Sequence, residues 1–129
     1  MEEASVRRLN GLQLAFIGDT VYDLYARGRA LEEHDESVRQ LHRRAVARVN
    51  AAAQARAFAA VEPLLSEEEA DVARRGRNAH SRPPKNQDPG DYARATALEA
   101  LCGYLYLMGR NERLDELMRV IRQEEEDHA

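Results

Sequence analysis

The stretch from Leu12 to Leu24 reads Leu-Gln-Leu-Ala-Phe-Ile-Gly-Asp-Thr-Val-Tyr-Asp-Leu and is one of the two most apolar segments of the chain. Its apolar side chains recur at helical spacing on nearly every face, which predicts a helix that is buried all round. Gly18 and Asp19 interrupt this pattern. A glycine inside a helix costs roughly 1 kcal/mol relative to alanine, and an ionised carboxylate away from water needs a partner. The two residues together indicate a functional position.

A second segment, from Ala93 to Met108, repeats this combination. It is again apolar on nearly every face, with one carboxylate at Glu99 and a glycine at Gly103. If the two helices pack together, Asp19 and Glu99 can face one another. Two close carboxylates repel unless one is protonated or a divalent cation lies between them. The alternative is that each acid pairs with an arginine of a neighbouring helix, because arginine is abundant in the chain.

The composition limits the class of protein. A length of 129 residues predicts a single domain spanning 1–129, large enough to bury a core without disulfides or zinc. The single cysteine, Cys102, excludes an internal disulfide framework and fits a reducing cytoplasm. No uncharged apolar run is long enough to span a membrane, and the N-terminus lacks a signal-peptide pattern. We therefore expect a soluble, cytoplasmic protein with no membrane partner.

Basic side chains are concentrated in two regions, although the net charge is −4 and the overall balance is not that of a dedicated nucleic-acid binder. Residues 39–56 contain five arginines and no acid, and residues 74–90 combine five basic side chains with three prolines and two glycines. A solvated helix face and a flexible linker are the alternatives to phosphate binding. The candidate RNA-binding residues are Arg39, Arg43, Arg44, Arg48, Arg74, Arg75, Arg77, Asn78, His80, Arg82 and Lys85.

Helical patterns dominate the chain, and no period-two strand pattern stands out, so the predicted class is all-α with five to seven helices. We expect helices over about 9–26 or 9–28, from Asp35 or Ser37 to about 61, from Ser66 toward 75, from about 88 to 109, and from 111 onward. Ser66 and Glu69 form a capping-box pattern, and Asn111 can cap the last helix. The acidic tail, about 124–129, is expected to fray.

Several kinds of chemistry are excluded by spacing. The four histidines share no ligand spacing with Cys102 or with each other, so a zinc site is not predicted. No glycine-rich loop precedes a Lys-Ser or Lys-Thr pair, which excludes the common phosphate loop. The remaining chemistry is that of a hard cation held by carboxylates.

Two motifs resemble one family. The sequence Ile-Gly-Asp-Thr-Val at Ile17–Val21 resembles the end of the ribonuclease III signature, and Ala97–Leu107 resembles the second acidic helix of that family. Together with Arg-Gly-Arg-Asn-Ala at Arg75–Ala79 and Pro-Lys-Asn at Pro84–Asn86, they make the chain similar to the Mini-ribonuclease III branch. Members of that branch consist of the catalytic domain without a separate double-stranded RNA-binding domain.

The resemblance implies an all-α fold like the ribonuclease III endonuclease domain. It also implies a homodimer in which the signature helices pack across the two-fold axis, and the small residues Ala15 and Gly18 are consistent with such packing. The implied activity is Mg²⁺-dependent cleavage of double-stranded RNA that leaves a 5′-phosphate and a 3′-hydroxyl. Asp19 and Glu99 are the catalytic and Mg²⁺-binding residues that the resemblance implies.

Other acids of the family pattern have no counterpart here. Full-length ribonuclease III enzymes place further carboxylates at positions that hold Leu12, Ala15 and Thr96 in this chain. Either water completes the metal shell, which Mg²⁺ favours, or a nearby acid such as Asp23 supports it.

The resemblance further implies a biological substrate, the precursor of the large-subunit (23S) ribosomal RNA, with a large-subunit ribosomal protein as an optional helper. One alternative is a catalytically inactive ribonuclease III-like scaffold that binds RNA or a ribosomal particle, which the missing acids favour. A helical adaptor that touches no RNA would fit the acidic balance but leaves the basic loop unexplained.

Overall fold

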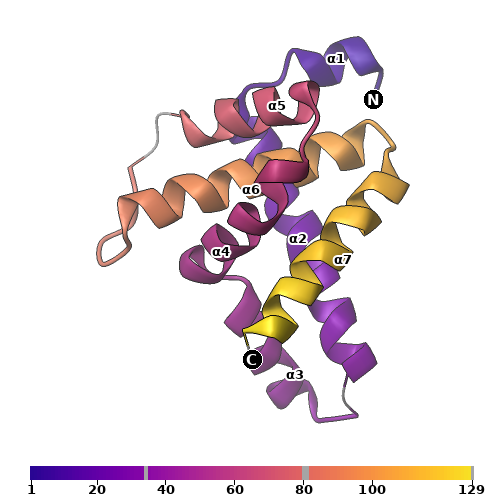
Figure 1. Cartoon of the computed structure of the whole chain (residues 1–129), viewed down its shortest axis with the longest axis vertical. Coiled ribbons are helices and arrows are strands. Elements are labelled where there is room, and N and C mark those ends of the chain that lie inside the picture. The colour runs from indigo at the N-terminus through magenta and orange to yellow at the C-terminus, as the bar shows by residue number, and fades with distance from the viewer. Residues whose placement is uncertain (34, 80–81, 129) are drawn as a thin grey trace.

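The protein is described here by a computed structural model covering residues 1–33, 35–79 and 82–128. Every regular element in these ranges is helical, which confirms the predicted all-α class (Figure 1). The elements are α1 (Glu3–Arg7), α2 (Gly11–Glu33), α3 (Val38–Arg48), α4 (Ala51–Val61), the 3₁₀ turn η1 (Glu62–Leu64), α5 (Glu67–Arg77), α6 (Pro89–Leu107) and α7 (Asn111–Asp127). No helix within these ranges combines the length and the apolar character needed to cross a bilayer.

The helices α2 and α6 cross at the centre of the molecule with almost no space between their backbones (Figure 1). A Cβ atom added at Gly18 would lie 1.6 Å from the backbone oxygen of Glu99, and one added at Gly103 would lie 2.1 Å from the backbone oxygen of Leu14. Only glycine permits this approach, because any side chain would overlap the opposite main chain. The two glycines thus bring the two acid-bearing helices together.

The core surrounds α6, whose residues from Ala95 to Leu105 are buried except at Glu99. The helices α4 and α5 pack along α6, and α7 packs on α4 and on the end of α6. Cys102 is fully enclosed in this core, and burial, with a smaller effect from Glu99, raises the pKa of its thiol to about 12. The thiol is therefore protonated and unreactive, in agreement with a packing role.

The prediction for the first long helix is wrong in two respects. Helix α2 continues past Gly28 to Glu33, because Ala30 is buried and Arg29 pairs with acids on its own helix and on α7. The helix is also not buried all round, since Phe16 is 83% exposed and Leu24 is 68% exposed. Helix α2 therefore exposes several large apolar side chains in the single chain.

The predicted second helix is divided into α3 and α4. Ser37 caps α3 as expected, through a capping box with Gln40. Asn50 then starts a new helix, because its Oδ1 accepts a hydrogen bond from the amide of Ala53 at 2.9 Å. The side chain of Asn50 thus supplies a helix start that the sequence pattern alone did not separate from a continuous helix.

The remaining helix ends mostly follow the predictions. Ser66 and Glu69 form the expected capping box of α5, Asp88 caps α6, and Gly109 follows the end of α6 with φ of +72°. Asn111 is the first residue of α7 rather than its cap. The expected fraying of the acidic tail is wrong as far as Asp127, because α7 continues to that residue and Glu125 is held by arginines.

Candidate active site

Asp19 on α2 and Glu99 on α6 lie in hydrogen-bond contact where the two helices cross. Glu99 is partly buried, whereas Asp19 lies at the exposed rim, so the predicted burial of Asp19 is wrong. Burial, followed by the hydrogen bond and the negative charge of Asp19, raises the pKa of Glu99 from 4.5 to about 8. The predicted approach of the two acids is confirmed, and near neutral pH Glu99 retains a proton.

Neither acid has a cationic partner. In the described part of the chain, no arginine or lysine forms an ion pair with Asp19 or Glu99, whereas the next acid on α2, Asp23, binds Arg27 at 2.9 Å. The alternative in which each acid pairs with an arginine is therefore not what these helices form. An unbalanced pair of carboxylates is the arrangement that a divalent cation would neutralise.

A cavity of about 220 Å³ opens beside Asp19 between α2 and α3. Its lining residues are Asp19, Thr20, Asp23, Arg27, His42, Ala45, Val46 and Val49. Asp23 therefore faces the same space as Asp19, as its position one turn along the helix suggested. Thr20 and His42 were not predicted, because nothing in the sequence places α3 against this part of α2.

The position one turn before Glu99 has a structural role. The hydroxyl of Thr96 donates a hydrogen bond to the backbone oxygen of Tyr92 at 2.9 Å, so it is already satisfied within α6. Among residues 1–33, 35–79 and 82–128, no group of three or more His, Cys, Asp and Glu side chains is arranged to hold a metal ion. The two carboxylates of Asp19 and Glu99 are therefore the acidic groups that the structure brings together where α2 and α6 cross.

Another side chain at the site was missed in the sequence. Gln54 of α4 is 4% exposed, and its amide lies against Glu99, where it favours the ionised form of that carboxyl. The signal was present as a single amide in the otherwise apolar, alanine-rich segment 51–61, apart from Arg56. A polar group in such a position needs a partner, which is a reason to expect it near another polar site.

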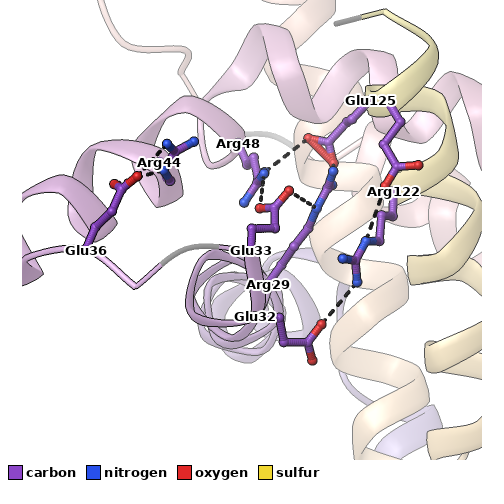
Figure 2. A network of polar contacts seen from close by, with 9 residues as sticks. Arg29, Glu32, Glu33, Glu36, Arg44, Arg48, Arg122 and Glu125 are labelled. Carbon is purple, nitrogen blue, oxygen red and sulfur yellow. Dashed lines mark hydrogen bonds and ion pairs between the residues drawn. The ribbon is translucent and has the colours of Figure 1, made fainter.

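Two of the candidate RNA-binding arginines on α3 are bound to acids (Figure 2). Arg48 contacts Glu33 at 2.5 Å and Glu125 at 3.7 Å, and Glu125 also binds Arg29 at 2.6 Å. Arg44 makes two hydrogen bonds to Glu36, at 2.7 and 3.1 Å. Arg48 thus joins α3 to α2 and α7, and Arg44 ties α3 to the segment before it, so their present contacts are structural.

Three arginines near the end of α5 also have partners. Arg74 pairs with Asp71 at 3.3 Å, and Arg77 lies 3.9 Å from Glu62. Arg75 donates to the backbone oxygen of Leu9 at 3.1 Å, which ties α5 to the segment before α2. The other candidates of this region differ in placement: Asn78 is the C-cap of α5, and His80 lies outside the described residues.

Four candidates remain uncommitted. Arg39 and Arg43 on α3, and Arg82 and Lys85 before α6, are exposed and form no ion pair within the residues that the structure describes. They are the basic side chains most available to an outside anion. Their contact with RNA stays a prediction.

Comparison with known proteins identifies the family. Residues 12–110 match the family described as Ribonuclease III domain. The chain is 46% identical over 120 residues to Mini-ribonuclease 3 of Symbiobacterium thermophilum, an alignment that covers 92% of each chain. It is 40% identical over 129 residues to Mini-ribonuclease 3 of Gloeobacter violaceus, covering 100% of this chain and 94% of that one.

The fold is likewise shared with a solved structure. A crystal structure of a protein from Fusobacterium nucleatum matches with a TM-score of 0.83 and 28% sequence identity, covering 94% of this chain and 98% of that one. The family match spans both α2 and α6, and therefore both members of the acid pair. The chain belongs to the ribonuclease III family and is an endoribonuclease.

Proposed function

We propose that Asp19 and Glu99 form the catalytic centre of a Mg²⁺-dependent endoribonuclease that cuts double-stranded RNA. The observation that carries this proposal is the acid pair, two carboxyl groups in contact with no cationic partner among the described residues. An arrangement that raises a carboxyl pKa to about 8 is costly for folding, and such arrangements are concentrated at functional sites. Membership of the ribonuclease III family supports the same reaction.

The donor set fits Mg²⁺. This ion prefers oxygen ligands, keeps several of its waters, and is commonly held by only one or two carboxylates together with substrate phosphate. Two carboxylates, with no third acid, histidine or cysteine grouped with them among the described residues, match this preference. When bound, Mg²⁺ supplies Lewis acidity toward a phosphoryl oxygen and activation of water for an in-line displacement.

The two acids have different positions and therefore different tasks. Asp19 lies at the exposed rim beside the cavity, where an RNA strand arriving from solvent can be met. Glu99 is held deeper by the crossing of α2 and α6, so its backbone is fixed. Asp23 can add support from the same cavity only by weakening its pair with Arg27. Cleavage at this centre would leave a 5′-phosphate and a 3′-hydroxyl.

Duplex RNA would be gripped through its phosphates and 2′-hydroxyls, since its sequence is poorly accessible in an A-form helix. The uncommitted basic side chains Arg39, Arg43, Arg82 and Lys85 are the strongest candidates for these contacts. Those already bound to acids, such as Arg48, can take part only by exchanging partners. The RNA-binding surface therefore lies on α3 and on the segment before α6.

A homodimer is part of this proposal. Leu12, Phe16 and Leu24 of α2 are 41%, 83% and 68% exposed, which leaves large apolar side chains on a surface that a second copy could cover. Gly18 lies against α6 of the same chain and Ala15 is buried within it, so they are not the residues that would form this contact. Sedimentation of the parent and of Phe16→Asp tests it: we expect a dimer for the parent and a monomer for the variant.

The biological substrate that we infer is the precursor of the large-subunit ribosomal RNA, processed in the cytoplasm. The names of the Mini-ribonuclease 3 relatives support this class of enzyme. A large-subunit ribosomal protein that presents the RNA is an additional candidate partner. Comparison of naked precursor RNA with precursor bound by ribosomal proteins would measure whether such help is needed.

A non-catalytic scaffold is the second candidate function. It is favoured by the absence, in the described residues, of any group of three metal-binding side chains. It predicts that the protein binds an RNA duplex with strong salt dependence but never cuts it.

The deciding experiment is cleavage of an internally labelled RNA duplex by purified protein in Mg²⁺, in EDTA, and with the variant Asp19→Asn. We expect cutting that requires both Mg²⁺ and Asp19. Asp127→Asn, at the exposed end of α7, is the matched control and should cut like the parent. Intact duplex that is nevertheless bound, with naked and ribosomal precursor RNA alike, would support the scaffold instead.

A further inference from the structure

Gln54 is a buried amide without a complete set of partners. It lies on α4 among Ala55, Ala57 and Phe58, and it is 4% exposed. Its Nε2 makes no hydrogen bond of good geometry in the described part of the chain. Leaving such a donor unpaired away from water is unfavourable, and an apolar side chain of the same size would pack at lower cost. The amide therefore calls for a reason beyond packing.

The neighbour of this amide is the acid pair. The helix α4 packs along α6, and Gln54 is the polar side chain of α4 that reaches Glu99. Glu99 is thus contacted from two sides, by Asp19 of α2 and by Gln54 of α4.

The amide of Gln54 also compensates for a carboxylate that the site lacks. No carboxylate stands at Thr96, one turn before Glu99, and the hydroxyl of Thr96 is bound to the backbone of Tyr92. Asp19 and Gln54 are the polar side chains that act on the Glu99 carboxyl from its two sides. Groups of this outer kind commonly fix the orientation of a metal-binding carboxylate.

We propose that Gln54 is a positioning residue for the catalytic centre: its buried amide orients the Glu99 carboxylate so that Glu99 and Asp19 can hold one Mg²⁺ ion. The inference rests on the proposed function, because it assigns Gln54 to the same centre. Gln54 acts through Glu99 and is given no contact with RNA.

The test substitutes Gln54→Met, which keeps the size of the side chain and removes its donors. We expect metal-free Gln54→Met to melt no lower than the parent, because an unpaired polar group has been removed. Its affinity for Mn²⁺, measured without RNA by the electron paramagnetic resonance of the free ion, should fall about tenfold. The Mg²⁺ concentration for half-maximal cleavage should rise by the same factor, with the KM for RNA at saturating Mg²⁺ unchanged.

Two further variants make the result decisive. Gln54→Ala should lose the same Mn²⁺ affinity, and it is compatible with the alanine-rich helix if Gln54→Met packs poorly. Thr96→Val is the matched control: it removes a buried hydroxyl on α6 that is already satisfied by Tyr92, and its Mn²⁺ affinity should equal that of the parent.

The outcomes separate the two proposals. If the parent neither binds Mn²⁺ nor cuts RNA, the proposed function fails. If the parent does both and Gln54→Met does both with unchanged metal dependence, the positioning role alone is overturned. A lower melting temperature with unchanged Mn²⁺ affinity would show that Gln54 serves only packing.

Discussion

Two clusters of charged side chains lie on α2, and they differ in whether their acids are paired with arginines. Around Arg29 and Glu33, acids alternate with arginines and each carboxylate meets a guanidinium, with Arg48 and Glu125 completing the cluster (Figure 2). Around Asp19, roughly 15 Å earlier at a helix rise of about 1.5 Å per residue, Asp19 and Glu99 form no ion pair with any arginine or lysine among the described residues. Each acid of the first cluster has a guanidinium partner within the chain, although Arg29 Nε and Arg48 Nη1 make no hydrogen bond there, whereas the second pair would be balanced only by a cation from outside the described chain.

This difference separates structure from function in physical terms. In the balanced cluster, the hydrogen bond and charge of Arg48 and the charge of Arg29 outweigh the effect of burial and lower the pKa of Glu33. In the unbalanced pair, burial and Asp19 act in the same direction and raise the pKa of Glu99 to about 8. Removal of a charge should therefore destabilise the first cluster and stabilise the second.

The largest expected effect is on catalysis. Asp19→Asn and Glu99→Gln should each lower the rate of duplex cleavage by about 10³-fold or more, since loss of a preorganised charge in an active site commonly costs 10²–10³. Single-turnover cleavage at saturating Mg²⁺ measures it. A variant that keeps a tenth of the parent rate would remove that residue from the centre.

The next effect concerns the balanced cluster. Arg48→Met leaves Arg29 as the only remaining described cation for both Glu33 and Glu125, in an environment where the Arg48 side chain is 15% exposed. We expect a loss of about 2 kcal/mol in the free energy of unfolding, below the 3–5 kcal/mol of fully buried pairs. Urea denaturation at pH 7 measures it. The matched variant Arg39→Met, at an exposed position without an ion pair among the described residues, should change stability little.

The opposite sign is expected in the unbalanced pair. Because the folded-state pKa of Glu99 lies near 8 and its usual value is 4.5, the metal-free parent loses stability as pH rises between these values. Glu99→Gln removes that loss, so it should be more stable than the parent at pH 9, by an amount that shrinks as the pH falls and vanishes near pH 4. Thermal melts in EDTA across this range test the sign. A variant that is less stable at pH 9 would contradict the description of the pair.

The Mg²⁺ requirement of cleavage should depend on the protonation of Glu99. Below pH 8, Mg²⁺ must displace the proton of Glu99, so the Mg²⁺ needed for half-maximal cleavage should rise by about tenfold per pH unit toward pH 6. Cleavage assays at a series of Mg²⁺ concentrations and pH values measure it. A requirement that does not change between pH 6 and pH 9 would mean that Glu99 is already ionised in the active protein.

The smallest expected effect distinguishes free from committed arginines. Arg39→Gln with Arg43→Gln should reduce the salt dependence of RNA binding by about 2 in slope, near one per lost phosphate contact. Arg44→Gln, whose guanidinium is bound to Glu36, should change the slope less. Binding of catalytically inactive Asp19→Asn protein to duplex RNA at several salt concentrations provides the measurement.

Much of the fold could be predicted because its signals are local. The caps at Ser37 and Ser66 and the glycine after α6 depend on a few neighbouring residues, and they were found where expected. The extension of α2 beyond Gly28 depends on Arg48 and Glu125, which are distant in sequence. Local patterns carry no information on such partners, so the predicted end was too early.

The candidate site also has residues that could be predicted from local sequence and residues that could not. The approach of Asp19 to Glu99 could be predicted because each acid lies on an apolar helix within one turn of a glycine. Gln54 and His42 reach the site from α4 and α3, and only the packing of those helices reveals them. The arginines of α3 could be recognised as a group, but their division into bound and free members depends on acids of α2, α7 and the segment before α3.

The contact between Gly18 and Gly103 determines how precisely the two carboxylates are spaced. Bonds from Mg²⁺ to oxygen are held close to 2.0–2.1 Å, a far narrower range than side-chain packing usually respects. Here the separation of the two helices is fixed by main-chain atoms, since a Cβ at Gly18 would come within 1.6 Å of the opposite backbone. The hydrogen atoms of the two glycines set the distance between the helices. This fixed distance in turn determines the spacing of the two carboxylates.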